Sequence, residues 1–207
     1  MLMKGNIRPP YLTGEPIWQS SRSIDAETYR KYAIQALCID ANSRILDIFF
    51  GTRSWVAEIT AEAWKTHYFG LETSEAPVRK ASRMFKSYTE KRKAAFSVYS
   101  GEKIPYVTRF FHRVLCRLSG AEHISGYFFT EAYRVLGYGG ILVVLYQPRK
   151  AFDEAVSLVD SALEAGFVLR NFGMYHLESD TDKNMAIPHD EHVLITLEKP
   201  LKITDAK

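Results

Sequence analysis

The stretch Arg44-Ile45-Leu46-Asp47-Ile48-Phe49-Phe50-Gly51-Thr52-Arg53-Ser54 decides the fold of this chain. Its apolar first half predicts a buried strand, Gly51 predicts a tight turn, and residues 54–65 predict a helix. A second apolar run, 67–72, ends in the acid Glu72. A strand, a glycine turn, a helix and a strand that ends in a carboxylate form the nucleoside-binding half of a doubly wound sheet.

This arrangement supplies two groups that suit a nucleoside. The N-terminus of the helix offers N–H groups that have no partner inside the helix. The Glu72 carboxylate can accept hydrogen bonds from both ribose hydroxyls. The turn carries one glycine where nucleoside-binding turns usually carry two or three. No Gly-x-Ser-x-Gly elbow, Walker loop or Cys-x-x-Cys pair occurs in the sequence.

The composition indicates one ordinary soluble domain. The chain has 207 residues, of which 46% are hydrophobic and 25% charged, and its net charge of +3 is too small to indicate a nucleic-acid partner by itself. No apolar run is long enough to span a bilayer, and we expect no signal peptide. Cys38 and Cys116 are the only cysteines, and we expect reduced thiols in a cytoplasmic protein. No metal is predicted, because no cysteine or histidine spacing matches a metal template.

We divide the chain into an irregular N-terminal arm (1–22), one domain (23–200) and a C-terminal tail (201–207). The arm is rich in Pro and Gly and shows no helical or strand period. It is interpreted either as a strap across the surface or as a lid over a substrate site. Ser23 is predicted to cap the first helix of the domain, over residues 25–39.

The remaining elements alternate between strands and helices. Helices are predicted at 77–92, 124–135 and 151–165, and strands at 95–99, 113–117, 141–146, 167–175 and 192–197. Residues 136–140 are predicted to form a turn. The strand at 141–146 is the most hydrophobic in the chain and is therefore expected at the centre of the sheet.

The helix at 77–92 carries the one cluster of charge that bears on nucleic acid. A solvated helix face is one interpretation, and a docking surface for RNA or DNA is the other. The basic residues of this cluster that would contact nucleic acid are Arg79, Lys80, Arg83, Lys86, Lys91 and Arg92.

Strand and helix alternate five times before two strands follow in succession, and this order resembles the class I S-adenosylmethionine-dependent methyltransferases. Residues 45–52 resemble the first motif of that family, and residues 68–74 resemble the second. Residues 111–119 are similar to its fourth strand and the following loop, and residues 131–144 to the run through its fifth strand. The resemblance, over residues 25–199, implies an α/β fold of three layers: a doubly wound, mostly parallel seven-stranded sheet with an antiparallel closing strand.

The resemblance also implies a function, a cofactor and a set of site residues. The implied function is methyl transfer from S-adenosylmethionine to an unknown acceptor, a small molecule or nucleic acid. The acceptor pocket would include Tyr146 and Gln147. His123 is the candidate general base, and an ordinary histidine at a helix start is the alternative. The implied cofactor-binding residues are Asp47, Phe49, Gly51, Thr52, Glu72, Thr73, Ser100, Gly101 and Cys116.

Three departures from the family pattern keep a second function open. Arg53 stands where the family usually has glycine, and Ser100 stands where it usually has an acid. Residues 116–119 lack the Asn/Asp-Pro-Pro-Tyr/Phe sequence that grips a flipped base, which counts against base methylation by that route. The alternative is an inactive methyltransferase-like domain that serves as a binding or scaffolding subunit. A nicotinamide-dependent reductase is a weaker third hypothesis, because the Gly-x-Gly-x-x-Gly turn is absent.

Overall fold

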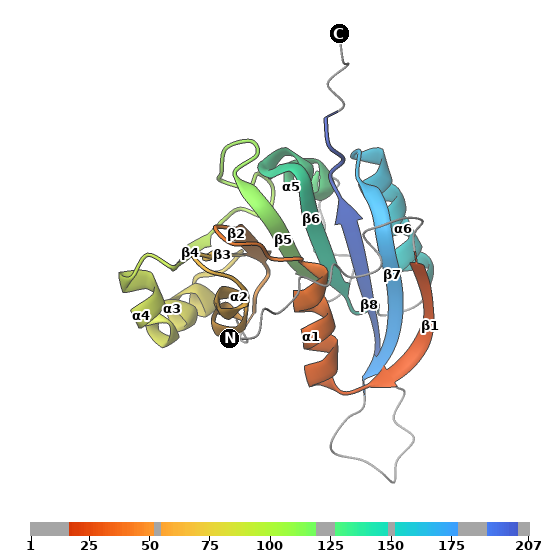
Figure 1. Cartoon of the computed structure of the whole chain (residues 1–207), viewed down its shortest axis with the longest axis horizontal. Coiled ribbons are helices and arrows are strands. Elements are labelled where there is room, and N and C mark those ends of the chain that lie inside the picture. The colour runs from red at the N-terminus through yellow and green to blue at the C-terminus, as the bar shows by residue number, and fades with distance from the viewer. Residues whose placement is uncertain (1–16, 52–54, 119–126, 149–151, 178–189, 203–207) are drawn as a thin grey trace, which may run out of the picture.

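The computed structural model describes residues 17–51, 55–118, 127–148, 152–177 and 190–202. These residues form one eight-stranded sheet with helices on both faces (Figure 1). The strands are β1 (Ile17–Ile24), β2 (Arg44–Ile48), β3 (His67–Glu72), β4 (Ala94–Val98), β5 (Phe111–Leu118), β6 (Leu136–Tyr146), β7 (Val168–Leu177) and β8 (Asp190–Glu198). The helices are α1 (Ala26–Ala36), α2 (Val56–Glu62), α3 (Glu75–Met84), α4 (Lys86–Glu90), α5 (Phe128–Val135) and α6 (Phe152–Glu164).

The strand order confirms the predicted doubly wound fold. From one edge to the other the order is β4-β3-β2-β5-β6-β8-β7-β1, and only β8 runs antiparallel to its neighbours. The chain leaves β2 toward β3 and β4, and then returns to the other side of β2 as β5 and β6. The direction of winding therefore reverses between β2 and β5, and ligands of such sheets bind beyond the carboxyl ends of the strands at this place.

Two apolar cores hold the helices to the two faces of the sheet. One core joins α5 and α6 to the face that presents Leu46, Cys116 and Val144. The other joins α1 and α2 to the opposite face, which presents Ile45 and Leu115. Successive residues of a strand point to opposite faces, so the central strands are apolar without interruption. Residues 141–146 of β6 are all buried, as the sequence predicted for a central strand.

The sheet has one strand more than predicted. β1 comes from the region predicted as an irregular arm and pairs in parallel with β7 along its edge. Residues 17–24 contain neither Pro nor Gly, so every N–H in this segment can donate to a ladder, and the prolines and glycines that indicated irregular structure all precede it. The rest of the arm, residues 1–16, lies outside the described residues, so the strap and lid interpretations stay predictions.

Three local predictions were wrong in detail. Asp25, not Ser23, caps α1, because its side chain accepts a hydrogen bond of 2.8 Å from the Thr28 N–H while Ser23 belongs to β1. The helix predicted at 77–92 is two helices, since Phe85 leaves the helical region and its ring packs against Tyr88 and Phe96. The turn predicted at 136–140 is the first half of β6.

Neither cysteine forms a disulfide in the structure: Cys116 is buried and Cys38 is half-buried. None of the helices that the structure describes combines the length and the apolar character needed to cross a membrane.

Candidate functional site

The turn after β2 lies at the predicted place, at the carboxyl edge of the sheet. Gly51 is exposed and has a φ of 64°, in the left-handed region that favours glycine. Phe49 also lies in that region, with a φ of 58°, and its N–H donates a hydrogen bond of 2.9 Å to the Leu71 carbonyl. A bulky side chain in the left-handed region costs on the order of 1–2 kcal/mol. The backbone of the turn is therefore strained at Phe49.

Glu72, at the end of β3, meets this turn directly. Its side-chain oxygen Oε1 accepts a hydrogen bond of 2.6 Å from the Gly51 N–H, and the residue is only 8% exposed. Within the described part of the chain, Glu72 forms no salt bridge and no hydrogen bond through Oε2. A carboxylate has two oxygens with about four acceptor sites, so Glu72 can hold the turn through Oε1 and still accept hydrogen bonds from ligand hydroxyls.

The two phenylalanine rings of the turn point in different directions. The buried Phe50 ring packs edge-on against Phe96, with ring centroids 5.4 Å apart. Gly70 makes room for both rings, because a Cβ at this position would lie 2.8 Å from an atom of each. The half-buried Phe49 ring lies on the other face, with its centroid 6.2 Å from that of Tyr99.

Residues that follow β3 and β4, and Cys116 of β5, lie near this turn. The Tyr99 N–H donates a hydrogen bond of 2.9 Å to the Glu72 carbonyl. Burial raises the pKa of Tyr99, and the nearby Cys116 and Glu72 raise it further. Burial likewise raises the pKa of Cys116, which is therefore a neutral thiol at pH 7. Thr73 and Gly101 are also neighbours, since a Cβ on Gly101 would lie 3.6 Å from Cγ2 of Thr73.

Phe49, Gly51 and Glu72 thus lie at one turn, with Asp47 beneath it, and the role of the predicted residues in cofactor binding stays a prediction. Tyr99 was not predicted as a site residue. The exposed Ser100 makes a local contact, in which its Oγ lies 3.4 Å from the Glu102 N–H. Thr52 and the departure at Arg53 lie outside the described residues.

The two residues predicted for the acceptor pocket lie at the end of β6, and their role stays a prediction. Tyr146 is buried in the core, and its hydroxyl donates a hydrogen bond to Glu154 of α6. Gln147 is half-buried at the end of β6, and its N–H donates a hydrogen bond of 3.0 Å to the Leu118 carbonyl. His123, the candidate general base, lies outside the described residues, so its role stays a prediction.

Asp47 lies beneath the turn rather than on its surface. One of its oxygens, Oδ2, accepts hydrogen bonds of 2.6 Å from the Tyr68 hydroxyl and of 2.6 Å from the Arg117 guanidinium. Its other oxygen, Oδ1, is buried and has no partner among the described residues. Burial raises the pKa of Asp47, and the charge of Arg117 opposes that rise. Asp47 therefore acts on the turn through Arg117.

Sequence reasoning missed Arg117, which joins this site from the end of β5. The guanidinium donates to Asp47 and, over 3.2 Å, to the Phe50 carbonyl, and it lies 3.9 Å from the ring centroid of Trp55. The signal that could have found it is a charged residue directly after the apolar run 114–116, in a strand with the pattern of a buried one.

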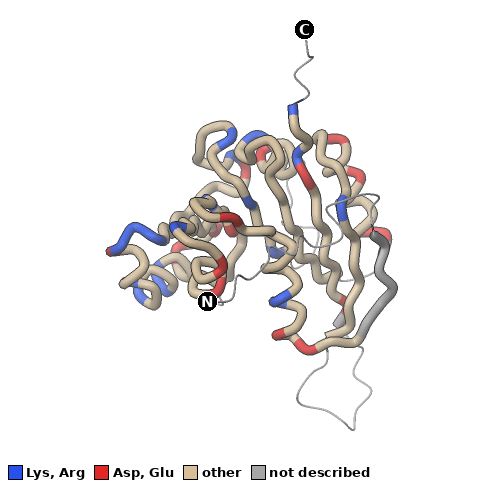
Figure 2. Tube along the Cα trace, viewed as in Figure 1, with Lys and Arg blue, Asp and Glu red and all other residues tan. Residues whose placement is uncertain are grey.

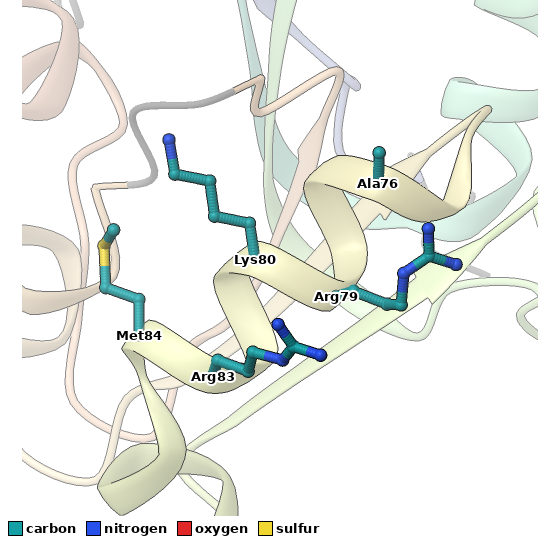
Figure 3. Close-up of a pocket in the computed structure, with 5 residues that line it drawn as sticks. All are labelled: Ala76, Arg79, Lys80, Arg83 and Met84. Atoms are coloured by element: carbon teal, nitrogen blue, oxygen red, sulfur yellow. The ribbon is translucent and has the colours of Figure 1, made fainter.

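The basic residues predicted to contact nucleic acid lie along α3 and α4, beside β4 (Figure 2), and Lys91 and Arg92 directly follow the end of α4. Three of them occupy α3, which begins three residues after Glu72. They border a shallow hollow of about 520 Å³ (Figure 3), and Arg79 there is paired with Glu75. The residues that line this hollow are Ala76, Arg79, Lys80, Arg83 and Met84.

Comparison with solved structures shows that the fold is that of the class I methyltransferases. Geranyl diphosphate C-methyltransferase from Streptomyces coelicolor A3(2), in complex with Mg2+, geranyl diphosphate and S-adenosyl-L-homocysteine, is 14% identical over 84% of this chain and 80% of that one, with a TM-score of 0.63. Precorrin-6y C5,15-methyltransferase from Geobacter metallireducens GS-15 is 16% identical over 87% and 93%, with a TM-score of 0.63.

The same fold also hosts another kind of reaction. The [4+2]-cyclase SpnF is 17% identical over 91% of this chain and 88% of that one, with a TM-score of 0.69. No family model matches the sequence, and no curated protein matches it either. At these identities the likeness concerns the fold, so the reaction has to be argued from the site.

Proposed function

We propose that this chain is a methyltransferase that binds S-adenosylmethionine between the Gly51 turn and Glu72. The observation that carries this proposal is the hydrogen bond of 2.6 Å from the Gly51 N–H to the Glu72 carboxylate. It brings a glycine turn and a nearly buried acid together where the winding of the sheet reverses. A ribose needs acceptors for two hydroxyls, and a carboxylate in such a place supplies them.

The residues around the turn fit the other parts of the cofactor. Gly51 has no Cβ, so a ligand can approach the main chain there closely. The half-buried Phe49 offers aromatic surface beside the nearly buried Tyr99, and the neutral Cys116 thiol is buried in the core near Tyr99. When bound, S-adenosylmethionine supplies an activated methyl group, so the protein chiefly has to align the acceptor and exclude water. These residues bind and orient, and none of them has to act as a nucleophile.

The alternative, an inactive domain, predicts a site that is closed by internal contacts. Such a site would commit Glu72 to a cationic side chain. In the described part of the chain Glu72 instead meets only a main-chain N–H through its side chain. The Phe50 ring turns to the Phe96 side of the sheet. Both observations support a working cofactor site.

Calorimetry with S-adenosylhomocysteine, the demethylated product, tests the proposal. We expect saturable binding to the wild type and at least a tenfold higher Kd for Glu72→Gln, because a hydrogen bond to a charged group contributes about 1.5–3 kcal/mol. Glutamine keeps an acceptor for the Gly51 N–H, so the variant removes the charge and keeps a hydrogen bond to the turn. Glu198→Gln is the matched control, since Glu198 pairs with Arg170 at the other edge of the sheet.

Two results would contradict the proposal. If the wild type shows neither heat of binding nor a rise in Tm with the ligand, the inactive alternative holds, because a ligand at a hundredfold above its Kd adds about 2.7 kcal/mol to stability. If Glu72→Gln and Glu198→Gln bind as the wild type does, the ligand lies elsewhere.

We further propose RNA or DNA as the acceptor class. The basic surface of α3 and α4 supports this choice, because α3 begins beside the proposed cofactor site and carries exposed cations around a hollow. Of the six cations, Arg79 is paired with Glu75, and Lys86 lies 3.7 Å from Glu90. A phosphate backbone bound along α3 would lie beside the proposed cofactor site.

Fluorescence anisotropy with single-stranded RNA at several salt concentrations tests this acceptor class. The double variant Lys80→Glu/Arg83→Glu should bind at least tenfold more weakly, and the slope of log K against log salt should fall by about 1.4. Lys31→Glu/Lys103→Glu makes the same change of net charge on other elements and should bind as the wild type does. Equal weakening by the two double variants would leave only a general effect of charge and favour a small-molecule acceptor.

A further inference from the structure

We infer that Arg117 is a positioning residue that fixes the orientation of the peptide group between Phe50 and Gly51. This inference rests on the proposed function, because that peptide group forms the turn at which the cofactor would bind. The Arg117 side chain is 16% exposed, and its guanidinium reaches the turn from β5. No sequence motif assigned it a role.

The peptide group between Phe50 and Gly51 is bound at both of its polar atoms. Its carbonyl, on Phe50, accepts a hydrogen bond of 3.2 Å from Nη1 of Arg117. Its N–H, on Gly51, donates the hydrogen bond of 2.6 Å to Oε1 of Glu72. β5 and β3 flank β2 on its two sides, so a cation from one neighbour and an anion from the other hold a single peptide dipole. Both bonds are of the charge-assisted kind, which is stronger than the neutral kind.

Further contacts fix Arg117 itself. Its Nη2 donates to Oδ2 of Asp47 over 2.6 Å, and the same carboxylate oxygen accepts the hydroxyl of Tyr68. Its guanidinium also lies over the ring of Trp55, the residue before α2, with 3.9 Å to the ring centroid. Arg117 therefore touches the end of β2, the turn and the start of α2.

The turn needs such support because it lacks the glycines of its family. Phe49 occupies a conformation that glycine adopts freely, and Phe50 carries a large ring beside it. A turn of this composition has other conformations available, including one in which the peptide between Phe50 and Gly51 is flipped. A flip would turn the carbonyl toward Glu72 and the N–H toward Arg117, and each would then face a group of like polarity. The two charges select the observed orientation.

The same strand contains a matched control. Arg113 lies four residues before Arg117, so the two side chains leave β5 on the same face. The Arg113 side chain is 11% exposed, and it binds the Cys38 carbonyl through Nε and Nη2 and Asp40 through Nη2. It thus makes the same kinds of contact at the opposite edge of the sheet, where no cofactor turn lies.

The test compares Arg117→Met with Arg113→Met in the full chain, by amide hydrogen exchange at Gly51 and by calorimetry with S-adenosylhomocysteine. We expect the Gly51 amide to exchange at least tenfold faster in Arg117→Met, and the Kd for the ligand to rise at least tenfold. Both values should stay within twofold of the wild type in Arg113→Met, although both variants lose stability in urea. Arg117→Lys keeps the charge without the planar fork and should give values between the two.

The possible failures are distinguishable. Unchanged exchange at Gly51 in Arg117→Met and Arg117→Lys, or an equal change in Arg113→Met, would overturn the role of Arg117, whatever the ligand does. If the Gly51 amide exchanges faster in Arg117→Met but the wild type binds no S-adenosylhomocysteine, the role of Arg117 is supported and the proposed function is contradicted. If Arg117→Met does not fold, Arg117→Lys alone decides, because wild-type exchange and Kd in that variant would contradict the inference.

Discussion

The two ends of β5 carry arginines with similar partners and different consequences. Arg113 and Arg117 each bind a main-chain carbonyl and a carboxylate, and each is largely buried. The carbonyl bound by Arg113 belongs to Cys38, in the connection between α1 and β2, so this contact joins parts of the fold. The carbonyl bound by Arg117 belongs to the turn that would meet the cofactor. The position of a contact in the sheet, rather than its chemistry, decides whether it serves stability or binding.

Single contacts near the two ends of the strands extend this comparison. The amino edge of the sheet is the side at which its parallel strands begin. There, Lys199 donates to two carbonyls at the end of α5, and Arg44 donates to the carbonyl of Phe110. At the carboxyl edge, the buried Oδ1 of Asp47 has no partner among the described residues. Polar groups without internal partners are expected where a ligand or a moving segment completes the structure. Changes at the amino edge should therefore affect stability alone, and changes at the carboxyl edge should affect binding as well.

The largest effect on stability is expected from Lys199→Met. Lys199 is only 3% exposed, and its ammonium donates hydrogen bonds of 2.7 Å to the Tyr133 carbonyl and of 2.8 Å to the Leu136 carbonyl. Leaving both acceptors unpaired should lower the free energy of unfolding by about 2–4 kcal/mol. Urea unfolding at pH 7 measures this loss. Binding of S-adenosylhomocysteine should not change. A rise in its Kd would contradict the claim that changes at the amino edge affect stability alone.

A smaller loss of stability, combined with weaker binding, is expected from Gly70→Ala. The new Cβ would lie 2.8 Å from ring atoms of both Phe50 and Phe96, so both rings have to move. Such overpacking costs about 1–3 kcal/mol. Because Phe50 adjoins the turn, the Kd for S-adenosylhomocysteine should also rise. Gly137→Ala at the amino edge is the control, since its Cβ would lie 3.4 Å from the Phe111 carbonyl and should leave binding unchanged.

The smallest effect is a pH dependence that originates at the amino edge. Burial lowers the pKa of His112 from 6.5, and the charges of Arg44 and Arg113 lower it further. Below pH 6.5 the unfolded chain takes up a proton at His112 that the folded chain resists, so stability should fall as the pH falls from about 7 to 5.5. His112→Asn, which keeps an acceptor for the Arg44 N–H, should lose less stability over this range. Equal losses in urea unfolding would assign the pH dependence to other groups.

The sequence was sufficient to predict the main architecture and the meeting of Gly51 with Glu72. Both depend on local signals: an apolar strand, one glycine, and an acid at the end of the next strand. The role of these residues in cofactor binding stays a prediction. The strand β1 was not predicted, because the preceding residues are rich in Pro and Gly and the whole arm was interpreted as irregular. Its pairing with β7 also depends on residues that are distant in the sequence.

The contacts of side chains across the sheet were beyond sequence reasoning. Arg117 reaches the Phe50 carbonyl and Asp47 only because β5 returns beside β2, 70 positions after Asp47 in the chain. Tyr146 was predicted in an acceptor pocket because it ends a central strand. Its hydroxyl instead meets Glu154, which α6 brings over the same face. The direction of a side chain at a strand end depends on the helix that packs there, and the strand pattern does not contain that information.

A crystal structure of the chain with S-adenosylhomocysteine tests the central claim most directly. The account predicts both ribose hydroxyls within hydrogen-bonding distance of the Glu72 carboxylate, with the Phe50–Gly51 peptide still bound to Arg117. A ligand that lies away from Glu72, or a turn whose Phe50 carbonyl has left Arg117 in the complex, would contradict it.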